Sequence, residues 1–283
     1  MTAQLEQEQD RDPGLYGPDS VTWRVHADPS MALAGLRALM LQAVHPVAMH
    51  GVFTNSDFRA DPWGRLFRTA EYVAVTAYGT TREAERAGAR VRGIHRRLKG
   101  VEPVSGTAYR VDDPELLRWV HCSEVESFLS TAVRCGLRLT REEQDAYYAE
   151  QTRGARLVGL DPATVPSSVQ EMAEYFEDMQ PQLRVGPEGR AAAQFVLWPS
   201  MPALVQLGTP ARPAWTALAT ASFALLPRWA RRLYRLPGLP TTDLAATAAG
   251  LAFRNGLLVV PARLRNGPHL KAAQERVGVS RTR

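Results

Sequence analysis

The sequence of 283 residues is 45% hydrophobic and 22% charged, an ordinary globular composition that excludes a fibrous or largely disordered chain. Its net charge of +5 comes mainly from arginines scattered among acidic residues, and no nucleic-acid-binding motif accompanies them, so we expect no nucleic-acid partner. The two densest basic clusters, residues 96–99 and 228–235, are short. Each fits either a solvated helix face or a basic rim that attracts anionic groups.

The N-terminal residues 1–14 are polar and predict a disordered tail. They contain neither the basic start nor the apolar core of a secretion signal, and no stretch of the chain reaches the ~18 apolar residues of a membrane span. Cys122 and Cys135 fall in one predicted helix, about 20 Å apart by helical rise, which is too far for a disulfide. We therefore expect reduced thiols, a cytoplasmic protein and no transmembrane segment.

Helical periodicity dominates from Gly17 onward, and no internal repeat or long alternating strand is visible. A helix that is apolar nearly all round begins near residue 30 and ends at His45-Pro46, so it should be buried; residues 51–62 predict a loop. The later elements in chain order are helices at 62–79 and 81–100, a loop or short hairpin at 101–112, and helices at 113–136, 140–159, 167–180, 187–198, 210–235, 241–256 and 257–277. The sequence predicts an all-α fold with one large helical domain over residues 15–283.

Motifs of the common enzyme classes are absent from the sequence. Its six histidines match no zinc-ligand spacing, and no His-Glu-x-x-His occurs. The glycines form neither a dinucleotide-binding fingerprint nor a phosphate-binding loop, and no Gly-x-Ser-x-Gly elbow is present. Hydrolase, kinase and dinucleotide-dependent classes therefore lack their usual support.

The helix at 81–100 carries the first candidate site residue, His95. This histidine borders the apolar stripe of the helix, beside Val91 and Ile94, and the rest of that face is small, with Ala84, Ala87 and Gly88. Small neighbours leave room for a flat, bulky group, and a neutral imidazole on a rigid helix can bind haem iron. The alternative from these residues alone is an ordinary core histidine held by a hydrogen bond.

The preceding helix has an unusual polar face, on which two arginines and three hydroxyl-bearing residues recur at spacings of three and four: Arg65, Arg68, Thr69, Tyr72 and Thr76. This face is either plainly solvated or the polar wall of an active site that donates hydrogen bonds to bound oxygen or substrate.

A third helix, at 113–136, places His121 inside its apolar stripe, four residues after Leu117 and four before Val125. A buried imidazole has to be hydrogen-bonded or to act as a ligand. Glu124 lies at helical spacing from it, so His95, His121 and Glu124 form the one grouping that could hold non-haem iron.

Several short motifs, in this order, resemble the catalytic domain shared by rubber oxygenases (latex-clearing proteins) and the oxygenase of mycophenolic acid biosynthesis. The resemblance spans about residues 17 to 260. The residues that carry it are Leu41-Gln-Ala-Val-His-Pro46, Asn55-Ser-Asp-Phe58, Arg65-x-x-Arg68-Thr69, Gly79, Val91-x-x-x-His95-x-x-x-x-Gly100, Tyr109, Asp113-Pro114-x-x-x-x-Trp119-Val-His121 and Tyr147-Tyr148.

This resemblance implies an all-helical fold with haem b in a pocket between helices. His95 would be the proximal iron ligand, His121 would stand behind the haem pocket, and Arg65, Arg68 and Thr69 would form the distal side, with Arg65 and Thr69 also touching the cofactor. The position of Arg68 is a lysine in rubber oxygenases, where it can bind iron when deprotonated. Arginine keeps its proton, so the resemblance predicts a site without that internal sixth ligand.

Three functions remain open on these grounds. The leading one is a haem b-dependent oxygenase or oxidase that uses dioxygen or peroxide on a small hydrophobic intracellular substrate. The others are a non-catalytic haem sensor or carrier and a metal-free helical protein. Asp57 and His50 are the candidates for a distal acid or base, and the sequence leaves a homo-oligomer open.

Overall fold

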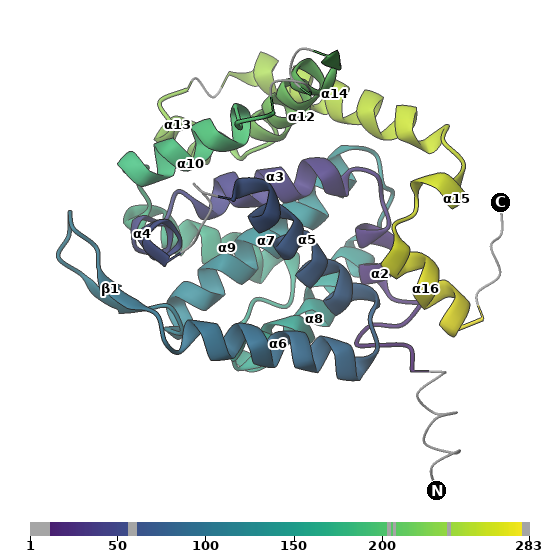
Figure 1. Ribbon diagram of the computed structural model, residues 1–283, viewed down its shortest axis with the longest axis horizontal. Coiled ribbons are helices and arrows are strands. Elements are labelled where there is room, and N and C mark those ends of the chain that lie inside the picture. Colours follow the sequence, from purple (N-terminus) through teal and green to yellow (C-terminus); the bar gives the residue numbers. More distant parts are fainter. Residues whose placement is uncertain (1–11, 56–60, 203–204, 206–207, 237–238, 279–283) are drawn as a thin grey trace, which may run out of the picture.

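The computed structural model describes residues 12–55, 61–202, 205, 208–236 and 239–278, and this part of the chain is almost entirely helical (Figure 1). The predicted all-α fold is confirmed. The helices are α2 Val21–His26, α3 Met31–Gln42, α4 Pro46–Asn55, α5 Pro62–Tyr78, α6 Thr81–His95, α7 Pro114–Arg134, α8 Arg141–Val158, α9 Val169–Met179, α10 Pro187–Leu197, α12 Ala211–Ala224, α13 Arg228–Leu233, α14 Pro240–Leu258, α15 Ala262–Arg265 and α16 Pro268–Arg276, with short 3-10 turns at Pro162–Thr164 and Gln180–Gln182.

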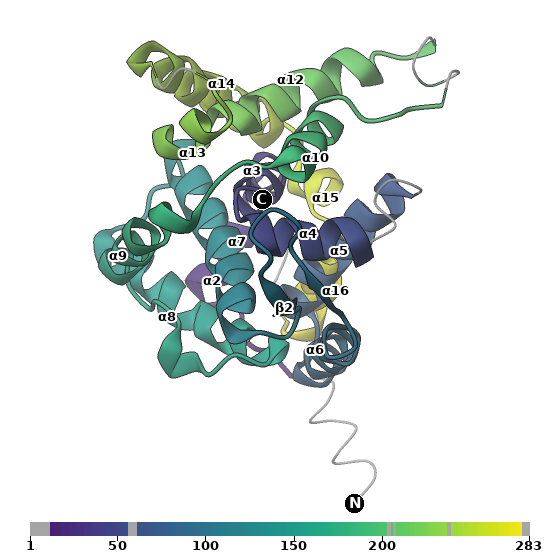
Figure 2. The same cartoon turned by 90° about the vertical axis from the view of Figure 1, so that its left-hand side faces the viewer.

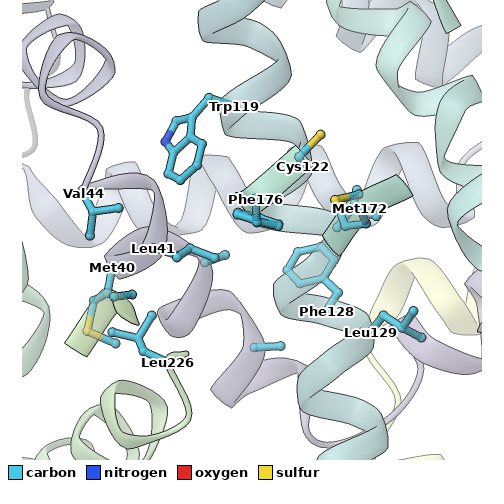
Figure 3. Packing of buried hydrophobic residues seen from close by; sticks show 14 of the residues in the cluster. Met40, Leu41, Val44, Trp119, Cys122, Phe128, Leu129, Met172, Phe176 and Leu226 are labelled. Atoms are coloured by element: carbon cyan, nitrogen blue, oxygen red, sulfur yellow. The ribbon is translucent and has the colours of Figure 1, made fainter. Parts of the chain in front are cut away.

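The helix α3 forms the centre of the fold. It lies beneath α10, α12 and α14 and against α7 (Figures 1 and 2). Residues on nearly all of its faces are buried, as its sequence predicted: Leu33, Ala34, Leu36, Arg37, Ala38, Met40 and Leu41. The main core cluster joins this helix to α7, α8, α9 and α12, and Figure 3 shows Trp119, Phe128 and Phe176 packed beside Leu41.

Directional bonds set how α3 and α7 pack against each other. The Arg37 guanidinium donates to both carboxylate oxygens of Glu126, at 2.7 and 3.1 Å, and to the Ser127 hydroxyl at 2.7 Å. At the C-terminal end of α3, the Trp119 indole donates to the Gln42 carbonyl at 3.1 Å. The two helices therefore run antiparallel in a defined register, with an ion pair near the middle of both helices and an aromatic anchor at the end of α3.

Local chemistry at the helix starts is as the sequence predicted. Asp61 and Asp113 cap helices whose first residue is a proline, and each carboxylate accepts a backbone N–H of the first turn. Thr80 and Thr140 each form a capping box with a glutamate three residues on. These caps determine where α5, α6, α7 and α8 begin, so they locate the segments that carry the candidate site.

The predicted loop at 51–62 is partly wrong, because residues 46–55 form α4. Pro46 was expected to end the preceding helix, but proline also suits a first helical position. The His45 Nδ1 accepts the Ala48 N–H at 3.2 Å, so the imidazole caps the new helix. Only Asn55 of the motif Asn55-Ser-Asp-Phe58 lies inside the described residues, and Asp57 lies outside them.

Two further helix boundaries differ from prediction. The single helix expected at 210–235 is two helices, broken at Pro227, and the one expected at 257–277 is interrupted at Pro261 and Pro268. The helix expected at 81–100 ends at His95, because Lys99–Val101 pairs with Ala108–Arg110 as an antiparallel hairpin, β1 and β2. Gly100 faces Tyr109 in that hairpin, where a Cβ would come 2.6 Å from the phenolic oxygen.

Only the last residues of the predicted N-terminal tail lie in the described part of the chain. Residues 1–11 lie outside it, whereas Asp12 is described and its carboxylate accepts the Thr81 N–H at 2.8 Å. Cys122 and Cys135 are free and buried, and burial raises their pKa values to about 12 and about 11.

In the described part of the chain no helix by itself is long and apolar enough to cross a membrane; α3 and α4 pass that test only as a pair bent by 105°.

Candidate functional site

The candidate site begins where α5 and α6 lie side by side. Two residues separate these helices, so α6 turns back beneath α5, and the two helices diverge from this connection (Figure 1). His95 ends α6 and Arg65 lies in the first turn of α5. The Arg65 charge is close enough to lower the pKa of His95, second only to desolvation, while Asp112 opposes the shift. The fold thus brings together two residues that the sequence places 30 positions apart.

His95 is a neutral imidazole without a protein partner. Desolvation and then Arg65 lower its pKa, so the ring is uncharged at neutral pH and keeps a free lone pair. Its Nδ1 is buried with no hydrogen-bond partner, and no side-chain hydrogen bond joins the ring to any other described residue. The hydrogen-bonded core histidine considered from the sequence is therefore not what the fold contains, since a satisfied core histidine would have a donor or acceptor here.

The hairpin that follows α6 brings α7 to the same end of the molecule. The Val111 N–H donates to the Leu98 carbonyl at 3.0 Å, so the chain returns past His95 just before α7 begins. Tyr72 of α5 lies close enough to Glu124 of α7 for the carboxylate charge to raise the pKa of the phenol, after the larger effect of desolvation. The second half of α5 and the middle of α7 therefore lie close enough for Tyr72 and Glu124 to interact electrostatically.

His121 and Glu124 lie one turn apart on α7. Desolvation alone lowers the pKa of His121 to about 4 and raises that of Glu124 to about 7, because burial disfavours the charged form of each group. Both side chains nevertheless keep accessible surface, and neither has a hydrogen-bond or ion-pair partner among the described residues. We call the region between α5, α6 and α7 that carries Arg65, Tyr72, His95, His121 and Glu124 the α5–α7 recess.

The residues on the polar face of α5 have different surroundings. Arg65 reaches the recess, and desolvation followed by the nearby Arg68 charge lowers its pKa although its surface is accessible. Arg68 instead donates to the Asp61 carboxylate at 3.0 Å, with 61% of its side chain exposed, and so lies at the rim. The Thr69 hydroxyl donates to the Arg65 carbonyl at 3.0 Å, which occupies its proton and leaves its oxygen as an acceptor.

Of the two candidates for a distal acid or base, the described His50 is not among the residues that meet here. The His50 imidazole binds the Glu188 carboxylate at 2.7 Å and packs edge-on against Tyr109, between α4 and the hairpin. Asp57 lies outside the described residues. The acid that does meet the recess is Glu124, which the sequence singled out only as a potential iron ligand.

A tyrosine cluster behind Glu124 was missed from the sequence. The carboxylate raises the pKa values of Tyr16 and Tyr147, after the larger effect of desolvation, and the Tyr147 hydroxyl lies 3.3 Å from the His26 Nε2. These residues come from the segment before α2, from α2 itself and from α8. No spacing in the sequence relates them, although the Tyr147-Tyr148 pair belongs to the motifs of the resemblance.

The non-haem iron site considered from the sequence is wrong for the part of the chain that the structure describes. No three His, Cys, Asp or Glu side chains there lie close enough together to hold a metal ion. His95, His121 and Glu124 border one recess but do not form a facial ligand set. A single imidazole with a free lone pair is instead the ligand that a haem needs from the protein.

The raised pKa of Glu124 predicts a pH-dependent stability. The folded protein holds this proton up to about pH 7, whereas the unfolded chain releases it near 4.5. Stability from the protonated group is therefore complete below 4.5 and is lost as the pH rises through 7. In protein without added haem, Glu124→Gln should raise the free energy of unfolding at pH 8 by about 1–3 kcal/mol and change it little at pH 4.5.

Urea denaturation at the two pH values measures this effect. Glu85→Gln, on the exposed face of α6, is the control and should match the wild type at both. Burial lowers the pKa values of His26, His45 and His121 to about 4, so stability falls below pH 6.5 in every variant and cancels in the difference. Equal stability of Glu124→Gln and wild type at pH 8 would show that the carboxylate is solvated.

Comparison with known proteins gives one match. The family described as "ER-bound oxygenase mpaB/B'/Rubber oxygenase, catalytic domain" matches residues 23–257, which is most of the chain and includes all of α5, α6 and α7. No curated protein and no solved structure gives a significant match.

Proposed function

Because the chain belongs to the family of the mpaB and rubber oxygenase catalytic domain, we propose that it is a haem b-dependent oxygenase of small hydrophobic molecules. Membership in the family establishes the oxygenase domain, and the haem, its ligand and the substrate class are our proposal. The observation that supports it most directly is His95: a neutral imidazole, without a hydrogen-bond partner, at the C-terminal end of α6.

The residues of the α5–α7 recess are chemically suited to haem. His95 offers the single nitrogen ligand, and Arg65 stays protonated in spite of its lowered pKa, so it can pair with a propionate or with an oxygen of the substrate. The buried Nδ1 of His95 has no partner, which is unusual unless another group completes the site. When bound, haem would supply the iron at which dioxygen or peroxide reacts.

The side chains of the protein would supply a proton donor and acceptor and a neutral, desolvated hydrogen-bonding group. Glu124 has a pKa of about 7, so its carboxyl can both give and accept a proton near neutral pH at Oε1 or Oε2. His121 stays neutral because its pKa is about 4, and it would act as a hydrogen-bonding group rather than as a charge. Arg68 cannot bind iron and is paired with Asp61, which supports a site without an internal sixth ligand.

Titration of the purified protein with haemin tests this proposal. We expect a Soret band that saturates at about one haem per chain, and oxygen consumption when a reductant and an apolar substrate library are added. Protein that stays free of a Soret band after reconstitution would contradict the haem proposal. A saturating Soret band with no oxygen uptake for any substrate would instead support the haem carrier or sensor.

A further inference from the structure

The outward face of α14 is mostly apolar, and Asn255 is the exposed polar residue between Leu251 and Leu258. Leu244, Leu251 and Leu258 recur every seven residues along it, with exposed fractions of 73%, 37% and 40%, and Val259 beyond them is 83% exposed. Arg254 is the only charged residue between positions 243 and 263. Soluble proteins rarely leave several large apolar side chains uncovered along one helix, and such a surface is typical of a site that meets a partner or a membrane.

The inner face of α14 explains why its one cation does not interrupt that surface. The Arg254 guanidinium turns inward and donates to the buried Asp28 carboxylate at 2.7 Å. Ala246 and Gly250 pack against the core, and a Cβ on Gly250 would come 2.5 Å from the Cys135 sulfur. The helix is thus held rigidly by its inner side and presents its apolar side outward, along the upper layer of the fold (Figure 2).

Exposed cations and further apolar side chains lie at both ends of this helix. Before it, Arg232 and Arg235 are exposed, and so are Leu236 and Leu239. After it come the exposed Arg263 and Leu264, the latter 71% exposed. Arg231, expected from the sequence on a solvated basic face, is instead buried on Asp243 at 2.6 Å, so only part of that cluster contributes.

A shallow groove beside the apolar face has the same character. It lies between α12 and α14, has a volume of about 700 Å³ and is lined largely by alanine and threonine side chains. Trp198 stands at the groove, 60% exposed, with the Arg212 guanidinium 4.8 Å from its ring centre. Tryptophan and arginine at the edge of an apolar surface are typical of a membrane–water interface.

The C-terminal third of the chain is strongly basic, which favours an anionic partner for the α14 face. Residues 190–283 hold thirteen Lys and Arg against two acidic residues, Asp243 and Glu275, whereas the first 189 residues hold twenty-one basic and twenty-seven acidic residues. A second copy docked on the same face would bring the exposed Arg232, Arg235 and Arg263 of both copies together. We propose that the α14 face docks this protein on a membrane surface rich in anionic lipids.

In this arrangement Leu244, Leu251 and Leu258 enter the boundary between headgroups and acyl chains, as the apolar side of an interfacial helix does. The arginines at both ends of α14 meet lipid phosphates. The proposal concerns a helix that lies on the membrane, and it is independent of haem because no residue of the α5–α7 recess takes part.

Flotation with vesicles tests it on the full chain. We expect the protein to float with vesicles of 70% phosphatidylcholine and 30% phosphatidylglycerol and to stay behind with phosphatidylcholine alone. Leu244→Glu should abolish flotation, because a charge enters the apolar phase. Arg232→Gln should weaken binding to the anionic vesicles by about 5-fold. Val101→Glu adds the same charge at an exposed apolar position of the hairpin and should float like wild type.

Two results would overturn the proposal. One is flotation of Leu244→Glu equal to that of Val101→Glu, which would place the contact elsewhere. The other is a wild-type protein that does not float but forms a dimer in light scattering that Leu244→Glu dissociates, which would assign the face to a second copy. Circular dichroism and the midpoint of thermal unfolding check that each variant is folded, and Leu251→Glu provides a second variant if Leu244→Glu is not.

Discussion

Replacing His95 with glycine is expected to abolish haem binding, and added imidazole is expected to restore it. The free lone pair of a neutral His95 is the proposed iron ligand, and loss of the ligand should cost more than the ~10–100-fold in affinity that follows from mutating a supporting residue. Free imidazole fits the space that the missing side chain leaves. Haemin titration followed at the Soret band, with and without imidazole, measures both effects.

The control for this experiment is His269→Gly. That histidine lies on α16 and binds Glu71 at 2.9 Å, away from the recess, so the variant should bind haem like wild type. Glycine near the end of α6 costs about 1 kcal/mol of stability, which thermal unfolding of both variants will register. Unchanged haem affinity in His95→Gly, with loss in His121→Gly, would move the ligand to α7 and overturn the proposed site.

Replacing Arg37 with alanine is expected to lower the free energy of unfolding by about 3–5 kcal/mol, among the largest effects of any single polar residue in this fold. Its side chain is 3% exposed and donates to the Glu126 carboxylate, the Ser127 hydroxyl and the Leu225 carbonyl. Removal of the guanidinium leaves the Glu126 carboxylate, whose side chain is 17% exposed, and the Ser127 oxygen without this donor at the centre of the α3–α7 packing, whereas the Leu225 carbonyl keeps the Arg134 donor at 3.3 Å. Urea denaturation with circular dichroism measures the loss.

Two further variants separate this mechanism from a simple loss of volume. Arg37→Met combined with Glu126→Leu removes both charges and keeps apolar volume, so most of the stability should return. Arg24→Ala breaks an exposed pair with Glu143, whose side chains are 44% and 33% exposed, and should cost only ~0–1 kcal/mol. A loss below about 1 kcal/mol in Arg37→Ala would mean that water reaches and satisfies Glu126.

Local features of the fold could be predicted because they depend on neighbouring residues. The capping threonines and aspartates and the buried α3 follow from chemistry within a few positions, whereas the hairpin at 99–110 was expected only as an alternative to a loop and over 101–112. The wrongly predicted helix boundaries arise where a local sequence signal is compatible with two structures. Pro46 can end one helix or begin the next, and the His45 imidazole that caps α4 decides for the second. Pro227 and Pro261 break helices that periodicity alone would continue.

The candidate site likewise combines features that the sequence predicts with features that depend on the tertiary structure. Periodicity marks Arg65, His95 and His121 as unusual residues on three helices, and the ordered motifs identify the family. Neither can show that Arg65 acts on His95, that Arg68 pairs with Asp61 at the rim, or that Glu124 is the acid in the recess. Their roles toward haem and substrate remain predictions.

The sequence by itself determines an all-helical chain, the capped starts of α5, α6, α7 and α8, and its family, because these depend on residue type, spacing and order. Only the tertiary structure decides the protonation of His95, His121 and Glu124, because a pKa depends on the burial and charge contributed by other helices. It also decides that Arg254 turns inward while the leucines of α14 face outward, since that orientation is set by Asp28, more than two hundred residues away.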